Sequence, residues 1–167
     1  IRKENGWEKK IKPRPEEIDE WPQYLHGADN NAVAEDSLVG PPRHLQWKGK
    51  PNWMRSHMTI PSVVNMISSG GRLFTIEDRA TPENPFLPGE WYLIARDAFN
   101  GKILWKRKFS NWEPITRYVK DMADQLQRRL VATNGSVYCT PGLDAPLTEY
   151  DASTGDVIKK YSNSGDI

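Results

Sequence analysis

The chain has 167 residues and a formal net charge of +1, and 37% of its residues are hydrophobic. This length suits one domain of ordinary size, and the balanced charge excludes a general electrostatic attraction to nucleic acid. No apolar run is long enough to span a membrane as a helix. The single cysteine, Cys139, excludes an internal disulfide and lies in a strand-like stretch, so we expect a buried and unreactive thiol.

Residues 1–20 are polar and contain two prolines among charges, in "KPRPEE", which indicates an extended linker. Several Lys and Arg gather there, and we expect a solvated chain end in preference to an arm that binds a polyanion. From residue 21, closely spaced Gly, Asn, Asp and Pro indicate an ordered irregular loop. We assign residues 21–59 to a lead-in segment in which "RHLQW" (43–47) forms a short strand.

Residues 60–109 predict four consecutive antiparallel strands, which we assign as a first blade. Apolar and β-branched residues alternate there with polar ones, as is typical of half-buried strands. The Gly-rich "SSGG" (68–71) predicts a hairpin turn between the first two strands. The expected strands are residues 60–67, 72–78, 91–97 and 102–109.

Residues 110–128 interrupt the strands with "YVKDMADQLQRR", whose period is closer to helical, so we expect an insertion with one or two helical turns. Residues 129–162 then repeat the four-strand pattern as a second blade, and residues 163–167 begin a further unit. Each unit is a four-stranded antiparallel meander, which is the blade of a β-propeller. The expected strands of the second unit are residues 129–133, 136–140, 146–151 and 156–161.

The two units share a phrase, "ARDAFNGKILW" (95–105) and "EYDASTGDVIK" (149–159). In each copy an Asp ends a strand, where its carboxylate can accept hydrogen bonds from the backbone of the following turn. A later Gly supplies a positive φ, and the Trp of the first copy projects to one sheet face as a spacer between stacked sheets. The residues that carry the repeat are Ala95, Asp97, Asn100, Gly101, Trp105, Asp151, Thr154 and Gly155.

The phrase around Asp97 and Gly101, ending in Trp105, resembles the tryptophan-docking repeat of the PQQ-like (quinoprotein-like) β-propellers. "WPQYLHGADNNAVA" (21–34) resembles the segment that begins many bacterial propeller domains of this family, and "GPPRHLQW" is similar to its planctomycete-type members. The resemblance covers residues 21–162. It implies an all-β partial β-propeller with four-stranded antiparallel blades of the quinoprotein-like type, located in the periplasm or cell envelope.

The resemblance also implies that Trp105 stacks against the turn of the next repeat, around residues 151–155. The second copy departs from the family pattern, because Glu149 stands where Ala is expected and Lys159 stands where Trp is expected. Tyr161 lies on the same strand face and is expected to substitute in part. These departures predict a non-standard outward contact for the second blade.

Two blades cannot close a propeller, which typically has about four to eight. We therefore expect a piece of a longer polypeptide in preference to a naturally short protein, completed by the remaining blades or by a protein partner. An isolated chain would expose sheet faces, and such patches favour association. A homo-oligomer, or strand exchange between copies, is the expected state of the isolated chain.

The favoured function is a non-catalytic propeller scaffold that binds a protein or a ligand. The alternative is part of a quinone-dependent dehydrogenase, which the resemblance implies would hold PQQ and calcium in the central channel of a full-length protein. Its active-site residues would lie mostly outside this chain, because nothing here maps onto that ligand set. A sandwich-like adhesion domain is a third class, and fold alone does not decide function.

No catalytic residue and no metal site is predicted. The three histidines, His26, His44 and His57, lack the spacing of metal ligands. Carboxylates that are adjacent in sequence are not evidence for acid–base catalysis. The stretch before the first blade combines Trp53, Arg55 and His57. A basic and aromatic loop at the mouth of a propeller could bind an anionic ligand, and ordinary packing and surface roles are the alternative.

Overall fold

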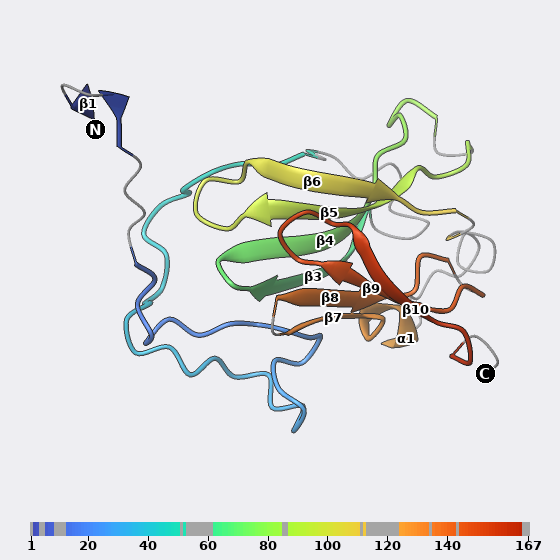
Figure 1. The fold of residues 1–167 in the computed structure, drawn as a ribbon, viewed down its shortest axis with the longest axis horizontal. Helices are drawn as coiled ribbons and strands as arrows, with labels where there is room; N and C mark the ends of the chain where they lie inside the picture. Colours follow the sequence, from blue (N-terminus) through green and yellow to red (C-terminus); the bar gives the residue numbers. More distant parts are fainter. Residues whose placement is uncertain are drawn as a thin grey trace.

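The computed structural model describes residues 2–3, 6–8, 13–50, 52, 62–84, 87–110, 112, 124–133, 135–142 and 144–164. Within these residues the chain forms two four-stranded antiparallel sheets, one short helix, and a two-stranded ladder of β1 (Arg2–Lys3) and β2 (Gly6–Trp7). Figure 1 shows the two large sheets next to each other, with the irregular segment that precedes them, in blue and cyan, along one end.

The first sheet is a meander in which every strand pairs with its neighbour in the sequence. Its strands form because apolar and β-branched residues alternate along them, which suits a pleated and half-buried surface. The first turn is tight because Gly70 and Gly71 have φ values of 60° and 72°, a region that glycine enters without a steric penalty. In spatial order the strands are β3 (Val63–Ser69), β4 (Arg72–Asp78), β5 (Trp91–Asp97) and β6 (Ile103–Lys108).

The second sheet is a meander of the same kind, and it follows the helical turn α1 (Asp124–Gln127). All the strands that the sequence predicts in the two units occur, and their ends are shifted by a few residues at most. Strand ends depend on the hydrogen bonds of the last pairs, which a residue pattern does not specify. The strands are β7 (Leu130–Thr133), β8 (Ser136–Cys139), β9 (Leu147–Asp151) and β10 (Val157–Tyr161).

One predicted strand is wrong. Residues 43–47 have no strand pairing in the structure. The weak alternation of "RHLQW" is satisfied in another way, because Gln46 and Trp47 use their side chains to bind the turn after β5. The segment is therefore held to the first sheet by side-chain contacts without joining its ladder.

The two sheets enclose one apolar core. We call the face of each sheet on the side of the next unit in the sequence its forward face, and the opposite face its backward face. The forward face of the first sheet packs against the backward face of the second, and β3 lies next to β7. The core includes Val64, Ile67, Phe74, Ile76, Trp91, Leu93, Ala95 and Trp105 from the first sheet, and Leu130, Ala132, Val137, Cys139 and Tyr150 from the second.

Two stacked meanders with neighbouring first strands have the architecture of two consecutive propeller blades. The predicted fold class, an all-β partial β-propeller of four-stranded antiparallel blades, is confirmed. In Figure 1 the turns that end β3 and β5 point toward the lead-in segment. Both turns therefore lie within reach of its side chains.

Candidate functional site

The sequence predicts one ligand-binding loop, and its residues lie outside the described part of the chain: Trp53, Arg55 and His57. Of the other histidines, His26 in the lead-in segment bonds through Nε2 to Asp19 Oδ2, just before that segment, at 2.7 Å, and His44 is exposed. The backbone N–H of Glu35 and the His26 ring hold the pKa of Asp19 below its ordinary value. This pair fixes the irregular segment, and the loop hypothesis stays a prediction.

The repeated phrase forms the same turn in both blades. Asp97 Oδ1 accepts two backbone N–H bonds of its turn at 2.9 and 3.0 Å, and Asp151 Oδ1 accepts two of its own at 2.8 and 2.9 Å. The turns close at Gly101 and Gly155, which have φ values of 73° and 72°. Bonds from the hydroxyl and N–H of Ser153 hold the pKa of Asp151 below its ordinary value.

The residue before each turn glycine also has the same part in both copies. Asn100 Oδ1 accepts the N–H of Lys102 at 2.9 Å, and Thr154 Oγ1 accepts the N–H of Asp156 at 3.2 Å. Each side chain satisfies a backbone donor at the exit of its turn. The polar residues of the phrase therefore hold the turns in shape.

Trp105 joins the two blades. Its ring packs on the second turn, and its Nε1 donates a hydrogen bond to the carbonyl of Ala152 at 3.0 Å. A Cβ on Gly155 would lie 2.6 Å from the Trp105 ring, so this position requires glycine for space as well as for φ. A buried indole with its N–H satisfied is a strong apolar contact, and it holds the second turn against the first sheet.

Trp47 makes the same contact one unit earlier, and the sequence analysis missed it. Its Nε1 donates to the carbonyl of Ala98 at 3.0 Å, and a Cβ on Gly101 would lie 2.4 Å from its ring. The signal was present, because Trp47 ends "LQW" as Trp105 ends "ILW". The sequence separation between each tryptophan and the carbonyl that it binds is also similar, 51 residues for Trp47 and 47 residues for Trp105.

Arg107 adds a second link between the blades that nothing in the residue pattern indicates. Its Nε donates to the carbonyl of Gly155 at 2.5 Å, and its Nη2 reaches the Thr154 carbonyl and the Asp156 carboxylate at 3.3 and 2.5 Å. The guanidinium therefore binds the same turn on which the Trp105 ring packs.

The forward face of the second sheet differs from that of the first at equivalent positions. Counted from the turn glycines, Tyr138 corresponds to Phe74. Counted from the repeated Asp and Gly, Glu149 and Lys159 correspond to the Ala and Trp of the first copy. A carboxylate, an ammonium and a phenol thus replace three apolar side chains.

These polar side chains form a hydrogen-bonded network. Glu149 Oε1 accepts from the hydroxyls of Ser136 and Tyr138 at 2.8 and 3.0 Å, and its Oε2 accepts from Tyr161 at 2.9 Å. The Lys159 ammonium lies 4.7 Å from the centre of the Tyr161 ring. The Ser136 bond and the two phenol bonds hold the pKa of Glu149 below its ordinary value, and the same carboxylate raises the pKa of Tyr161. We call these five residues the open face.

The open face is accessible to solvent and adjoins a hollow. Lys159 is exposed, and the other four members are half-buried. The hollow, of about 420 Å³, is lined by residues 159–164. Its lining includes ammonium, hydroxyl and amide groups, so hydrogen-bonding groups lie beside the open face.

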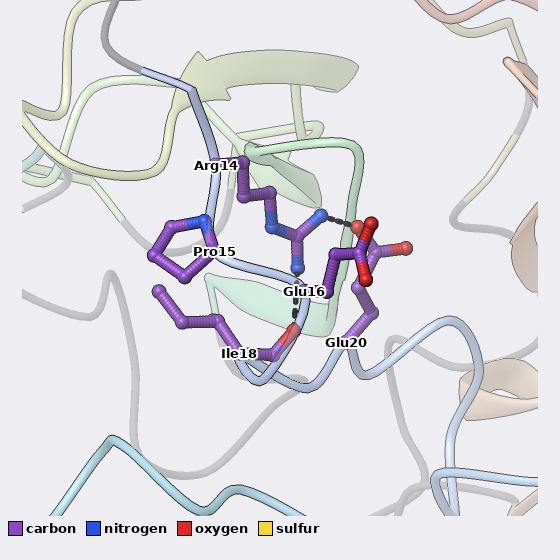
Figure 2. Close-up of a pocket in the computed structure, with 5 residues that line it drawn as sticks. All are labelled: Arg14, Pro15, Glu16, Ile18 and Glu20. Atoms are coloured by element: carbon purple, nitrogen blue, oxygen red, sulfur yellow. Dashed lines mark hydrogen bonds and ion pairs between the residues drawn. The ribbon is translucent and has the colours of Figure 1, made fainter.

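A second hollow, of about 380 Å³, is lined by residues 14–20, just before the lead-in segment (Figure 2). Arg14 crosses it, donates to the carbonyl of Ile18 and forms an ion pair with Glu20. Glu20 also accepts bonds from the hydroxyl of Ser69 and the N–H of Gly70, at 3.0 and 2.6 Å. The charged groups of this hollow thus hold residues 14–20 to the β3–β4 turn.

The backward face of the first sheet is closed by the chain itself. Glu77 and Arg96 are 2% and 5% exposed, and Arg96 Nη2 lies 3.3 Å from Glu77 Oε2. Thr75 and Arg79 also bond the carboxylate, at 2.6 and 3.0 Å, while Arg96 donates to the Lys50 carbonyl at 2.9 Å. A buried charge needs partners of this kind, and these groups are used within the fold.

Cys139 is fully buried, and burial raises the pKa of its thiol, so the thiolate is suppressed.

In the described part of the chain, no three His, Cys, Asp or Glu side chains are placed to hold a metal ion. No helix among the described residues has the length and apolar character needed to cross a membrane.

Fold and geometry together define a pair of four-stranded blades linked by a tryptophan and an arginine. No family model and no curated protein matches this sequence. Among solved structures, the chain is similar to a europium-containing methanol dehydrogenase at 14% identity, with a TM-score of 0.40. That match covers 68% of this chain and 18% of the length of the dehydrogenase.

Proposed function

We propose that the chain is part of a non-catalytic binding scaffold of the quinoprotein-like propeller type, and that the open face is its binding surface. The observation that carries the proposal is the exchange of three apolar side chains for Tyr138, Glu149 and Lys159 at equivalent positions. A surface that only packs on another sheet gains from apolar side chains. A preformed network of hydroxyls and charges instead favours a partner that offers hydrogen bonds.

The network is suited to binding and not to catalysis. A general base needs a free carboxylate within reach of the proton that it removes. The oxygens of Glu149 already accept three hydroxyl bonds, and its lowered pKa keeps it ionised and a weak base at neutral pH.

The test is site-specific photo-crosslinking in cells that express the chain. A photoreactive residue at position 159 is expected to give a defined covalent partner. The same residue at position 160 is the matched control, because Lys160 pairs with the fully buried Thr148 and lies on the other side of the strand. Equal yields at both positions, or none at either, would contradict the proposal.

The dehydrogenase alternative has its own measurement. The full-length protein is titrated with PQQ and Ca²⁺, and alcohol oxidation is followed with a redox dye. A scaffold takes up no stoichiometric quinone and leaves the dye oxidised. Stoichiometric uptake with alcohol-dependent dye reduction would overturn the scaffold in favour of the enzyme.

For localisation we propose the periplasm or cell envelope. Fractionation of the cells used for crosslinking tests this proposal.

A further inference from the structure

We infer that the open face is a self-association surface and that its partner is the open face of a second copy of this chain. The inference rests on the proposed function, because it names the partner of the same surface. Two observations carry it: the other central sheet faces are closed, and the charges of the open face are self-complementary.

The first observation is which faces are closed. The forward face of the first sheet and the backward face of the second cover each other in the apolar core. The centre of the first sheet's backward face is buried as well, with Thr75, Glu77, Ile94 and Arg96 all 5% exposed or less. The described residues thus leave the forward face of the second sheet as the exposed one. Copies that meet through one shared patch form a closed, isologous dimer.

The turns within the chain exclude the other obvious contact between copies. A tryptophan of one copy could in principle bind the turn of another. However, the turn at Gly101 is already filled by Trp47, and the turn at Gly155 is filled by Trp105 and Arg107. Both described turns are therefore used within their own chain.

The second observation is the charge pattern. Lys159 lies directly opposite Glu149 on the neighbouring strand, so the open face carries one positive and one negative group side by side. A two-fold axis between them places each copy's Lys159 against the other copy's Glu149. The interface then contains two ion pairs related by symmetry, and charge complementarity of this kind selects partner and register.

The network prepares Glu149 for this contact. Three hydroxyls orient the carboxylate before the partner arrives and leave it one lone-pair position for an incoming ammonium. A preorganised group loses less entropy on binding. Lys159 is exposed, and the side chain before it at the bulge of β10, Ile158, is 54% exposed. Val157 pairs with the buried core residue Tyr150 and therefore lies on the other side of the strand.

The test begins with sedimentation equilibrium of the 167-residue chain. A reversible dimer is expected, and Lys159→Glu should weaken it about tenfold or more because each copy then opposes two like charges. Lys160→Glu carries the same charge change on the other side of the strand and should leave the dissociation constant unchanged. A monomer at every soluble concentration, or equal effects of the two variants, overturns the inference.

A complementation experiment sharpens the result. Glu149→Lys leaves two positive groups on each open face, so this variant alone should be as weak a dimer as Lys159→Glu. Mixed in equal amounts, the two variants restore both ion pairs, and a heterodimer should form with an affinity near that of the unchanged chain. Circular dichroism establishes that each variant is folded, and no gain of dimer on mixing contradicts the two-fold arrangement.

The crosslinking experiment separates this inference from the proposed function. A crosslink from position 159 to another copy of the chain supports both. A crosslink from position 159 to one different protein, absent from position 160, upholds the binding scaffold and overturns self-association. No selective crosslink at position 159 overturns both.

Discussion

The forward faces of the two blades have the same backbone and opposite chemistry. In the first blade Phe74, Ala95 and Trp105 form a buried apolar surface, and in the second Tyr138 and Glu149 join a solvated network at equivalent positions. Both sheets are four-stranded meanders. In each, the third strand (β5 or β9) ends in a turn whose backbone N–H groups bind an Asp carboxylate. The architecture therefore depends on alternation and turns, while the chemistry of an outward face is free to vary.

The largest effect is expected when the apolar forward face of the first blade receives the carboxylate that the second blade has at the equivalent position. Ala95 is fully buried, so Ala95→Glu places a charge in the core without a partner. An uncompensated buried charge costs about 3–5 kcal/mol, and the added volume costs about 1–3 kcal/mol more. Urea unfolding should therefore show loss of most of the free energy of folding.

The reciprocal variant is the control. Glu149→Ala removes a carboxylate from a solvated face and should leave the chain folded, with a much smaller change in the urea midpoint. If the two variants destabilise the chain equally, the two forward faces do not differ in the way described.

Removing either tryptophan compares the two contacts within the chain. Trp105 is 8% exposed, and its replacement by Ala should cost about 3–5 kcal/mol, as for other large-to-small core changes. Trp47 is only half-buried, so Trp47→Ala should cost about 1–3 kcal/mol. Thermal unfolding measures both, and an order opposite to this one would contradict the assigned burial.

A methyl group tests the close approach of turn and ring. In Gly155→Ala the new Cβ meets the Trp105 ring at 2.6 Å, and overpacking of this kind costs about 1–3 kcal/mol in addition to the strain of a positive φ. Gly135 has a similar φ, 81°, and open space around it, so Gly135→Ala should cost about 1 kcal/mol from backbone strain. Equal losses in urea unfolding would show that the ring imposes no constraint.

Acid should weaken the second forward face selectively. The pKa of Glu149 is held below 4.5, first by Ser136, so its contribution to stability is complete above about pH 4.5 and is lost as pH falls through the folded-state value. Glu149→Gln should therefore flatten part of the acid fall in stability, measured by urea unfolding at a series of pH values. An unchanged slope contradicts the assignment.

The pKa of Tyr161 is shifted in the opposite direction to that of Glu149. Its pKa is raised, mainly by the bond to Glu149, so its contribution is complete below about pH 10 and is lost as pH rises further. Tyr161→Phe should show the smallest effect of this series, confined to alkaline pH and followed by the same unfolding measurement.

The strands and turns were predictable because they depend on local chemistry. Alternation places side chains on two faces, and the Asp and Gly of each phrase serve the turn that contains them. The burial of Cys139 followed from the same pattern. Strand ends and the state of residues 43–47 were not predictable in this way, because they depend on pairing with distant backbone.

The side chains of the open face were harder to group. Lys159 and Glu149 stood out as departures from the repeat, but the hydroxyls of Ser136 and Tyr138 carry no signal of their own. They meet the carboxylate through the register of β8, β9 and β10, which alternation alone does not specify. Arg107 carries no signal of its own either, because the turn that it binds lies 47 residues away in the sequence.

The two tryptophan contacts have a further consequence for the way the chain opens. Trp47 ties the lead-in segment to the first blade, and Trp105 ties the first blade to the second, so each unit is coupled to its nearest neighbours in a one-dimensional array. β10 lies at the edge of its sheet, beyond the last of these links. Amide hydrogens of β10 should exchange with solvent before those of β4 and β5, which marks β10 as the strand of the second blade that opens first.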